Sequence, residues 1–77
     1  MDNLKERQRI GDTIRKARKE NKITQKDLSD ALKIRQDVIS DYENGKIKVI
    51  PFEKRVKLAD ILNVPLSDLL YSDEIME

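Results

Sequence analysis

Two short segments with clear helical ends lie between residues 24 and 45. Thr24, followed three residues later by Asp27, has the capping-box pattern, so a helix is predicted to begin there. A second short helix is predicted to end at Gly45, because glycine adopts the left-handed C-cap conformation at least cost. Three or four residues separate the two helices. The residues expected to face inward are Leu28, Ala31 and Leu32 in the first helix, Ile34 in the connection, and Val38, Ile39 and Tyr42 in the second helix.

Apolar residues at helical spacing continue on both sides of this pair. A helix is expected over about residues 3–21, and Gly11 is expected to weaken its first half. Pro51 is placed to begin a fourth helix, and Pro65 a final short one. The residues expected on the buried sides of these helices are Leu4, Ile10, Ile14 and Ala17, then Phe52, Val56, Leu58, Ala59, Ile61 and Leu62, then Leu66, Leu69 and Leu70.

The predicted fold class is therefore all-α, with five helices in a single domain over residues 1–77. About residues 3–71 are expected to be folded, and the acidic segment 72–77 is expected to fray. In a chain of 77 residues without Cys, the hydrophobic core alone must hold the fold together. The absence of Cys and His also excludes disulfides, thiolate nucleophiles, imidazole bases and the common zinc sites. No cofactor is expected.

The net charge is only +1, but the charges are segregated along the chain. Residues 1–22 carry eight basic residues against four acidic ones, and residues 46–57 carry five against one. Residues 58–77 carry five acidic residues and no basic one. The molecule is expected to be positive on two segments and negative at its C-terminal end, unless the charges only form a solvated surface.

Hydropathy gives an expectation for location. No apolar run approaches the roughly 20 residues that a bilayer span needs. The basic N-terminal stretch is not followed by the apolar core of a signal peptide. No membrane contact is expected, and a cytoplasmic location is the default.

The two short helices resemble the Cro and phage-repressor helix-turn-helix family, also described as XRE-type transcriptional regulators. The resemblance is carried by Thr24-Gln25-Lys26-Asp27-Leu28 and by Val38-Ile39-Ser40-Asp41-Tyr42-Glu43-Asn44-Gly45, and it extends over about residues 10–71. It implies a compact lambda-repressor-like fold whose third helix lies in the major groove of duplex DNA, while the second crosses above the backbone. The implied function is sequence-specific DNA binding by a transcriptional regulator, with repression as the expected outcome.

The resemblance assigns base readout to the outer face of the third helix. Gln36 matches the first base-reading position, and its amide can make two hydrogen bonds to adenine. Arg35, Asp37, Ser40 and Asp41 surround Gln36 on this face. The two carboxylates depart from expectation, because they repel phosphates unless each accepts a bond from a cytosine N4 amine. Either Asp37 and Asp41 specify cytosine, or this face meets something other than DNA.

Phosphate contacts are implied on both sides of that face. They fall at Thr24 and Gln25, where the second helix begins, and at Asn44, Lys46 and Lys48 after the third. Gln25 is also implied to buttress the third helix. The loop that carries the two lysines is about two residues longer than the usual family spacing, which leaves open which of them reaches a phosphate.

Four further residues have structural roles implied by the resemblance. Arg18 and Glu43 match a partly buried ion pair, and loss of either partner would strand a charge. Lys33 stands where the family usually has Gly, which implies either a strained left-handed residue or a different turn. Tyr42 replaces a residue that is usually aliphatic, and its ring is expected in the core with the hydroxyl at the edge.

A homodimer on a pseudo-palindromic operator is expected, because one module of this kind makes few base contacts. Its candidate contact residues are Leu69, Tyr71 and Ile75.

A protein-binding adaptor is the alternative function. Tyr42 and the segment from Thr24 to Leu28 also resemble multiprotein bridging factors, and an antitoxin would use the same surface. In such an adaptor, Asp37, Asp41 and the acidic tail would meet a basic protein partner. Enzymatic activity is not expected, because two exposed Asp residues without His or an evident pocket lack the setting for acid–base or metal chemistry.

Overall fold

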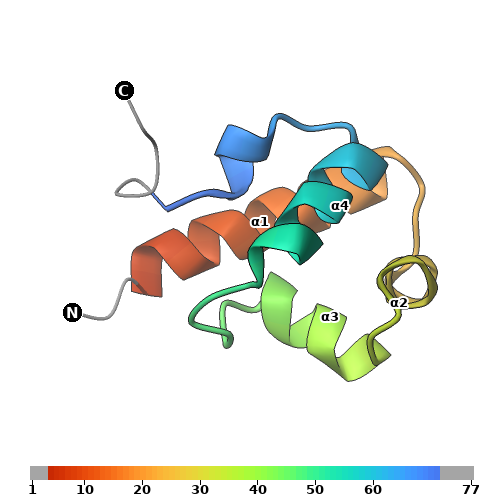
Figure 1. The fold of residues 1–77 in the computed structure, drawn as a ribbon, viewed down its shortest axis with the longest axis horizontal. Coiled ribbons are helices and arrows are strands. Elements are labelled where there is room, and N and C mark those ends of the chain that lie inside the picture. Colours follow the sequence, from red (N-terminus) through yellow and green to blue (C-terminus); the bar gives the residue numbers. More distant parts are fainter. Residues whose placement is uncertain (1–3, 72–77) are drawn as a thin grey trace.

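The computed structural model describes residues 4–71 as four α-helices followed by a short 3₁₀ helix (Figure 1). The acidic tail and Ile75 lie outside the described residues. No strand occurs within residues 4–71, so the all-α prediction is confirmed. The elements are α1 (Leu4–Glu20), α2 (Gln25–Leu32), α3 (Gln36–Glu43), α4 (Phe52–Leu62) and the 3₁₀ helix η1 (Leu66–Leu69). None of these helices is both long and apolar enough to cross a membrane.

The expected fifth α-helix is a single 3₁₀ turn instead. Pro65 is its N-cap residue, and the backbone is already extended again at Leu70, with φ −99° and ψ 150°. The 3₁₀ helix η1 therefore contains only four residues. One turn is enough to insert Leu69 fully into the core, and a longer helix is not formed.

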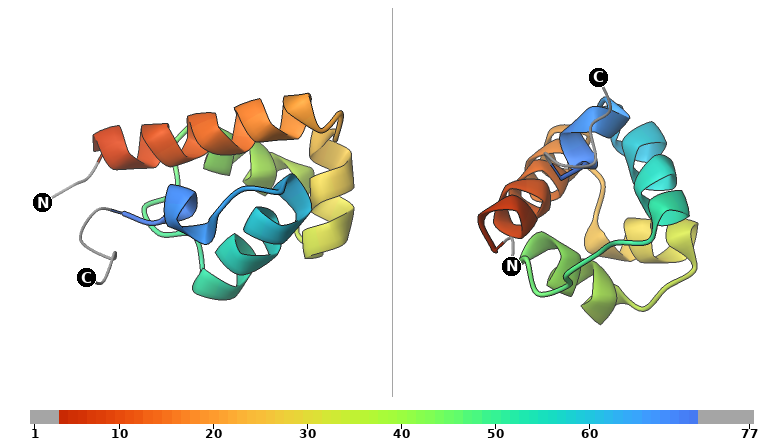
Figure 2. Two further views of the ribbon diagram at one scale, coloured as in Figure 1. Left: turned by 90° about the horizontal axis from the view of Figure 1, so that it is seen from above. Right: turned by 60° about the vertical axis from the view of Figure 1, so that its left-hand side comes forward.

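The longest helix, α1, runs along one side of the molecule, and the other elements lie on one side of it (Figure 2). α1 packs against α3, α4 and η1, while α2 packs against α3 and α4. Each large apolar side chain buried in the shared core contributes on the order of 1.5–3 kcal/mol. The fully buried apolar residues are Ile14, Leu28, Leu32, Ile39, Leu58, Leu62 and Leu69.

Gly11 allows α1 and the C-terminal end of α3 to approach closely. A Cβ atom at this position would lie 2.5 Å from the carbonyl oxygen of Glu43 and 2.7 Å from that of Tyr42. The expectation that Gly11 only weakens α1 is therefore incomplete. The absence of a side chain lets the backbones of α1 and α3 touch.

The turn between α2 and α3 has three residues and begins with a strained one. Lys33 is the C-cap of α2 in the left-handed conformation, with φ 58° and ψ 43°. The first of the two alternatives for Lys33 is therefore correct. The Ser29 hydroxyl donates to the Ile34 carbonyl oxygen at 2.5 Å, and Ile34 N donates to the Ser29 carbonyl oxygen at 3.1 Å. These two bonds hold the turn closed.

Four residues expected to face the core do not. Phe52 and Val56 are 59% and 42% exposed, because α4 turns its Arg55, Leu58, Ala59 and Leu62 side inward. Arg55 is buried on this side, at 4% exposed, and its guanidinium carbon lies 5.9 Å from the centre of the Phe52 ring. Leu4 is 49% exposed at the first residue of α1, and Ala31 lies on the solvent side of α2.

Candidate nucleic-acid interface

The outer face of α3 presents the residues that the resemblance assigned to base readout. Arg35, Gln36 and Asp37 are exposed, whereas Ser40 and Asp41, one turn further along, are half-buried. The Arg35 guanidinium Nε lies 3.2 Å from Asp37 Oδ1. This ion pair partly offsets one of the two carboxylate charges on the face. The first three residues therefore lie at the exposed start of α3, and Ser40 and Asp41 lie one turn further along the helix.

Glu43 ends α3 as a buried carboxylate that joins three elements. Its side chain is 1% exposed. Arg18 Nε donates to Oε2 at 2.7 Å and Arg18 Nη2 donates to Oε1 at 3.2 Å, so the two residues form the implied ion pair. Arg15 Nε lies 3.4 Å from Oε1, and Gln25 Nε2 donates to the same oxygen at 3.2 Å. The end of α3 is therefore attached to both α1 and α2.

The balance of interactions at Glu43 keeps it ionised. Burial by itself would raise the pKa of the Glu43 carboxyl. The hydrogen bonds from Arg18 and Gln25, the positive charge of Arg18 and the hydrogen bond from Arg15 together outweigh burial and lower that pKa below its ordinary value.

The start of α2 is fixed by the predicted capping box. The Thr24 hydroxyl oxygen accepts from Asp27 N at 3.0 Å, and Thr24 N donates to Asp27 Oδ2 at 3.0 Å. These backbone and side-chain bonds lower the pKa of the exposed Asp27 carboxyl. Because the Thr24 oxygen acts as the acceptor, its own proton stays available to a phosphate oxygen. The Gln25 amide is directed at Glu43, in the buttressing role that the resemblance implied.

Arg15 is a site residue that the sequence reasoning missed. Its Nη2 donates to Asn44 Oδ1 at 2.8 Å and to the Glu43 carbonyl oxygen at 3.3 Å. Asn44 Nδ2 in turn donates to Ser40 Oγ at 3.3 Å. The Asn44 side chain is therefore held between α1 and the outer face of α3. The spacing of three residues between Arg15 and Arg18 was the available signal, because it places them on neighbouring positions of one helix.

The loop after α3 carries the two lysines implied to contact phosphate, and both are exposed. The Tyr71 hydroxyl donates a hydrogen bond to the Lys48 carbonyl oxygen, which connects this loop to the C-terminal segment. Lys54 Nζ donates to the Leu32 carbonyl oxygen at 2.9 Å and thereby caps the C-terminal end of α2. The loop and the start of α4 are thus both anchored beside the helix pair, with Lys46 and Lys48 free to face solvent.

The structure describes two of the three candidate dimer contacts, Leu69 and Tyr71. Leu69 is 0% exposed in the protomer core, so its assignment as a contact residue was wrong. Tyr71 is half-buried, and its hydroxyl is directed at the Lys48 carbonyl oxygen.

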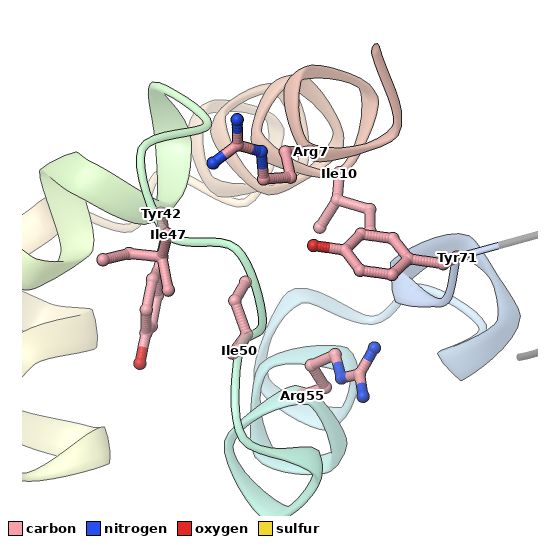
Figure 3. A pocket seen from close by; sticks show the side chains of 7 residues that line it. All are labelled: Arg7, Ile10, Tyr42, Ile47, Ile50, Arg55 and Tyr71. Carbon is pink, nitrogen blue, oxygen red and sulfur yellow. The ribbon is translucent and has the colours of Figure 1, made fainter. Parts of the chain in front are cut away.

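A small cavity lies between α1, the loop after α3, α4 and the C-terminal segment (Figure 3). Its volume of about 10 Å³ leaves room for no more than one water molecule. Tyr42 lines it with a ring that is 5% exposed, and burial raises the pKa of the Tyr42 hydroxyl. The cavity is lined by Arg7, Ile10, Tyr42, Ile47, Ile50, Arg55 and Tyr71. Within residues 4–71, no three His, Cys, Asp or Glu residues form a group that could hold a metal ion.

Comparison with known proteins agrees with this geometry. A family model described as helix-turn-helix matches residues 14–69. No curated protein matches the chain. The fold is similar to that in the crystal structure of the clp gene regulator ClgR from C. glutamicum, with a TM-score of 0.72 and 22% sequence identity. That similarity covers 83% of this chain and 82% of the ClgR chain.

Proposed function

Because this chain belongs to the helix-turn-helix family of DNA-binding domains, we propose that it is a transcriptional repressor that reads duplex DNA with α3 in the major groove. One observation carries the proposal. The first turn of α3 is exposed, and the last residue of the same helix, Glu43, is held by hydrogen bonds from Arg18, Arg15 and Gln25. Readout of DNA bases requires a helix held rigidly in this way, because a hydrogen-bonding side chain discriminates between bases only when its position is fixed.

Gln36 has the leading role in this proposal. Its exposed amide donates to N7 and accepts from the N6 amine of an adenine. Arg35, Ser40 and the two carboxylates lie around it and contact neighbouring base pairs. Asp37, which pairs with Arg35, and Asp41 accept bonds from cytosine N4 amines.

Phosphate contacts position the helix on the duplex. Thr24 and Gln25 at the start of α2, and Asn44, Lys46 and Lys48 after α3, bind the backbone on either side of the groove. The positive loop and the exposed N-terminus of α2 support this assignment, because an N-terminus carries unpaired N–H groups and a partial positive charge. Two protomers bind two half-sites about one DNA turn apart.

Gln36 provides the test of the proposed readout. Duplexes are selected from a random pool with the wild-type protein, and the affinity of Gln36→Ala for the selected sequence is then measured. The variant is expected to lose about 1–3 kcal/mol of binding free energy and to relax the preference at one base pair. The matched control is Gln8→Ala, which removes an exposed amide from α1 and is expected to bind as the wild type does.

The same measurement separates the adaptor from the repressor. The acidic residues on the outer face of α3 favour the adaptor, because carboxylates suit a basic protein surface better than a polyanion. If Gln36→Ala binds the selected duplex as tightly as the wild type, and Asp37→Lys abolishes a protein contact, the repressor proposal is wrong.

Salt dependence tests the phosphate contacts separately from base readout. Affinity is expected to fall steeply with salt, because phosphate contacts release counterions. Lys46→Ala or Lys48→Ala is expected to reduce the logarithmic salt slope by about one. Lys19→Ala, at an exposed position of α1, serves as the lysine control. An affinity that does not depend on salt would contradict a DNA partner.

A further inference from the structure

The exposed side of α4 combines apolar residues with one charge of each sign. Phe52 and Val56 lie four residues apart on this face and are 59% and 42% exposed. Glu53 and Lys57 follow them at the same spacing and are also exposed. Lys54 and Arg55 belong to the inner side, where they contact Leu32 and Leu69 through carbonyl oxygens. We call the residues Phe52, Glu53, Val56 and Lys57 the α4 face.

A third apolar side chain lies close to the α4 face. Val49 is 59% exposed and stands three residues before Phe52, so it lies within about 10 Å of it along the chain. Val49, Phe52 and Val56 are three of the four large apolar residues that are exposed in the described structure, the fourth being Leu4 at the start of α1. Exposed apolar residues that are clustered rather than scattered favour a contact surface.

We infer that the α4 face is the contact through which two copies of this chain pair when they occupy adjacent DNA half-sites. This inference rests on the proposed function and names the surface that joins the two protomers. A nucleic-acid partner does not suit the face, because its centre is apolar and it carries a carboxylate.

Charge complementarity identifies a second copy as the partner. In a two-fold symmetric contact, the same residues of both protomers meet each other. Antiparallel packing of two α4 helices brings the Glu53 end of one helix beside the Lys57 end of the other. Each protomer then contributes its Glu53 to one ion pair and its Lys57 to the other, on either side of the apolar centre.

The position of the face agrees with pairing on DNA. The hydrogen bond from Lys54 Nζ to the Leu32 carbonyl oxygen holds the first turn of α4 against the end of α2, so α4 is fixed in position relative to the helix-turn-helix. The protomer measures 31 × 23 × 20 Å. Two protomers in contact are therefore separated by a distance compatible with half-sites about 34 Å apart.

The size of the face sets the strength of the pair. Phe52 offers on the order of 100 Å² of exposed aromatic surface, and the two valines offer less. The apolar surface of both protomers together falls well below the roughly 1,200–2,000 Å² buried in stable interfaces. The free protein is therefore monomeric at micromolar concentration, and the contact forms when DNA holds two copies side by side.

Binding to duplexes with one or two half-sites tests the inference. Phe52→Ser and Val56→Ser are each expected to lower affinity for the two-site duplex about tenfold and to remove cooperativity, with single-site affinity unchanged within about twofold. Leu4→Ser removes another exposed apolar side chain and is expected to change neither affinity. Two-site binding that stays cooperative in both serine variants would overturn the inference.

A charge exchange tests the two-fold arrangement itself. Glu53→Lys and Lys57→Glu are each expected to weaken two-site binding, because like charges then meet across the contact. The double variant restores both ion pairs with exchanged signs and returns cooperativity toward the wild-type value, at the same net charge. A double variant as defective as the sum of the two single variants would overturn the antiparallel pairing.

Cross-linking of the free protein separates this inference from the proposed function. The chain has no Cys, so a single introduced thiol gives an unambiguous product. With a short bis-maleimide at high protein concentration, Val56→Cys is expected to give several-fold more covalent dimer than Leu4→Cys. Equal yields would overturn the α4 contact. If no duplex is selected from the random pool, the DNA-binding proposal fails, and the cross-linking result still decides whether the chain pairs through α4.

Discussion

Arg15 in α1 donates a hydrogen bond from Nη2 to Asn44 Oδ1 at 2.8 Å, and this bond orients the first residue after α3. The amide nitrogen of Asn44 is thereby directed at Ser40 Oγ, 3.3 Å away. A reversed amide would place its N–H groups against a guanidinium that has only donors. One arginine of α1 therefore controls a side chain at the edge of the proposed DNA-binding face.

The Arg15–Asn44 contact predicts energetic coupling in DNA binding. Arg15→Ala and Asn44→Ala are each expected to weaken binding, and the double variant is expected to be less defective than the sum of the two. The coupling energy between contacting residues is about 0.5–3 kcal/mol. A double-mutant cycle on the selected duplex measures it. The pair Lys19→Ala and Asn44→Ala is the control, and additive losses for Arg15 and Asn44 would contradict the coupling.

Glu43 predicts a loss of stability in acid. Its pKa is lower in the folded chain than the ordinary value of 4.5 that it regains on unfolding. The stability it contributes is therefore complete above about pH 4.5 and is lost as the pH falls through the folded pKa. Glu43→Gln is expected to lower the free energy of unfolding by about 3 kcal/mol at pH 7, because it leaves two arginines without their counter-charge.

Urea unfolding between pH 3 and pH 7 measures this effect. The difference between the wild type and Glu43→Gln is expected to narrow below the ordinary Glu pKa of 4.5. The Glu43 carboxyl is protonated there first in the unfolded chain and then, as the pH falls through the folded pKa, in the folded chain as well. If the difference stays constant with pH, the acid sensitivity lies in other carboxylates, such as Asp27, whose pKa is also lowered.

The close contact at Gly11 leads us to expect that substitution by alanine destabilises the fold. Alanine normally stabilises an exposed helix position by about 1 kcal/mol relative to glycine. Gly11→Ala is nevertheless expected to destabilise the protein by about 1–3 kcal/mol, because its Cβ would meet the Glu43 carbonyl oxygen at 2.5 Å. Thermal unfolding measures the change. Lys16→Ala on the exposed side of the same helix is the control, and a stabilised Gly11→Ala variant would refute the close approach.

Lys33 predicts that a lysine-to-glycine change stabilises the fold. The left-handed conformation, with φ 58°, costs a residue with a Cβ on the order of 1 kcal/mol. Lys33→Gly is expected to raise the free energy of unfolding by most of that amount. Lys16→Gly, within α1, makes the same chemical change and is expected to lower it by about 1 kcal/mol. Chemical denaturation of both variants shows whether their effects have opposite signs.

The helix positions were predictable because their signals are local. The capping box at Thr24 and Asp27 needs only residues within one turn, and the glycine stop at Gly45 needs only one residue. Burial on α4 was less predictable, since Val56 and Leu58 are both apolar and only the neighbouring helices decide which one faces inward. The same limit applied to Leu69, which is apolar enough for either a core or a contact surface.

The sequence by itself determined the all-helical fold, the two short helices joined by a turn, and the pairing of Arg18 with Glu43 through family resemblance. Only the tertiary structure decided that Arg15 holds Asn44, that Gly11 lets two backbones touch, and that Phe52 and Val56 face solvent. The physical reason is the distance along the sequence over which each interaction acts. Capping, periodicity and turn chemistry act within a few residues, whereas these three contacts depend on how α1, α3 and α4 are placed against each other.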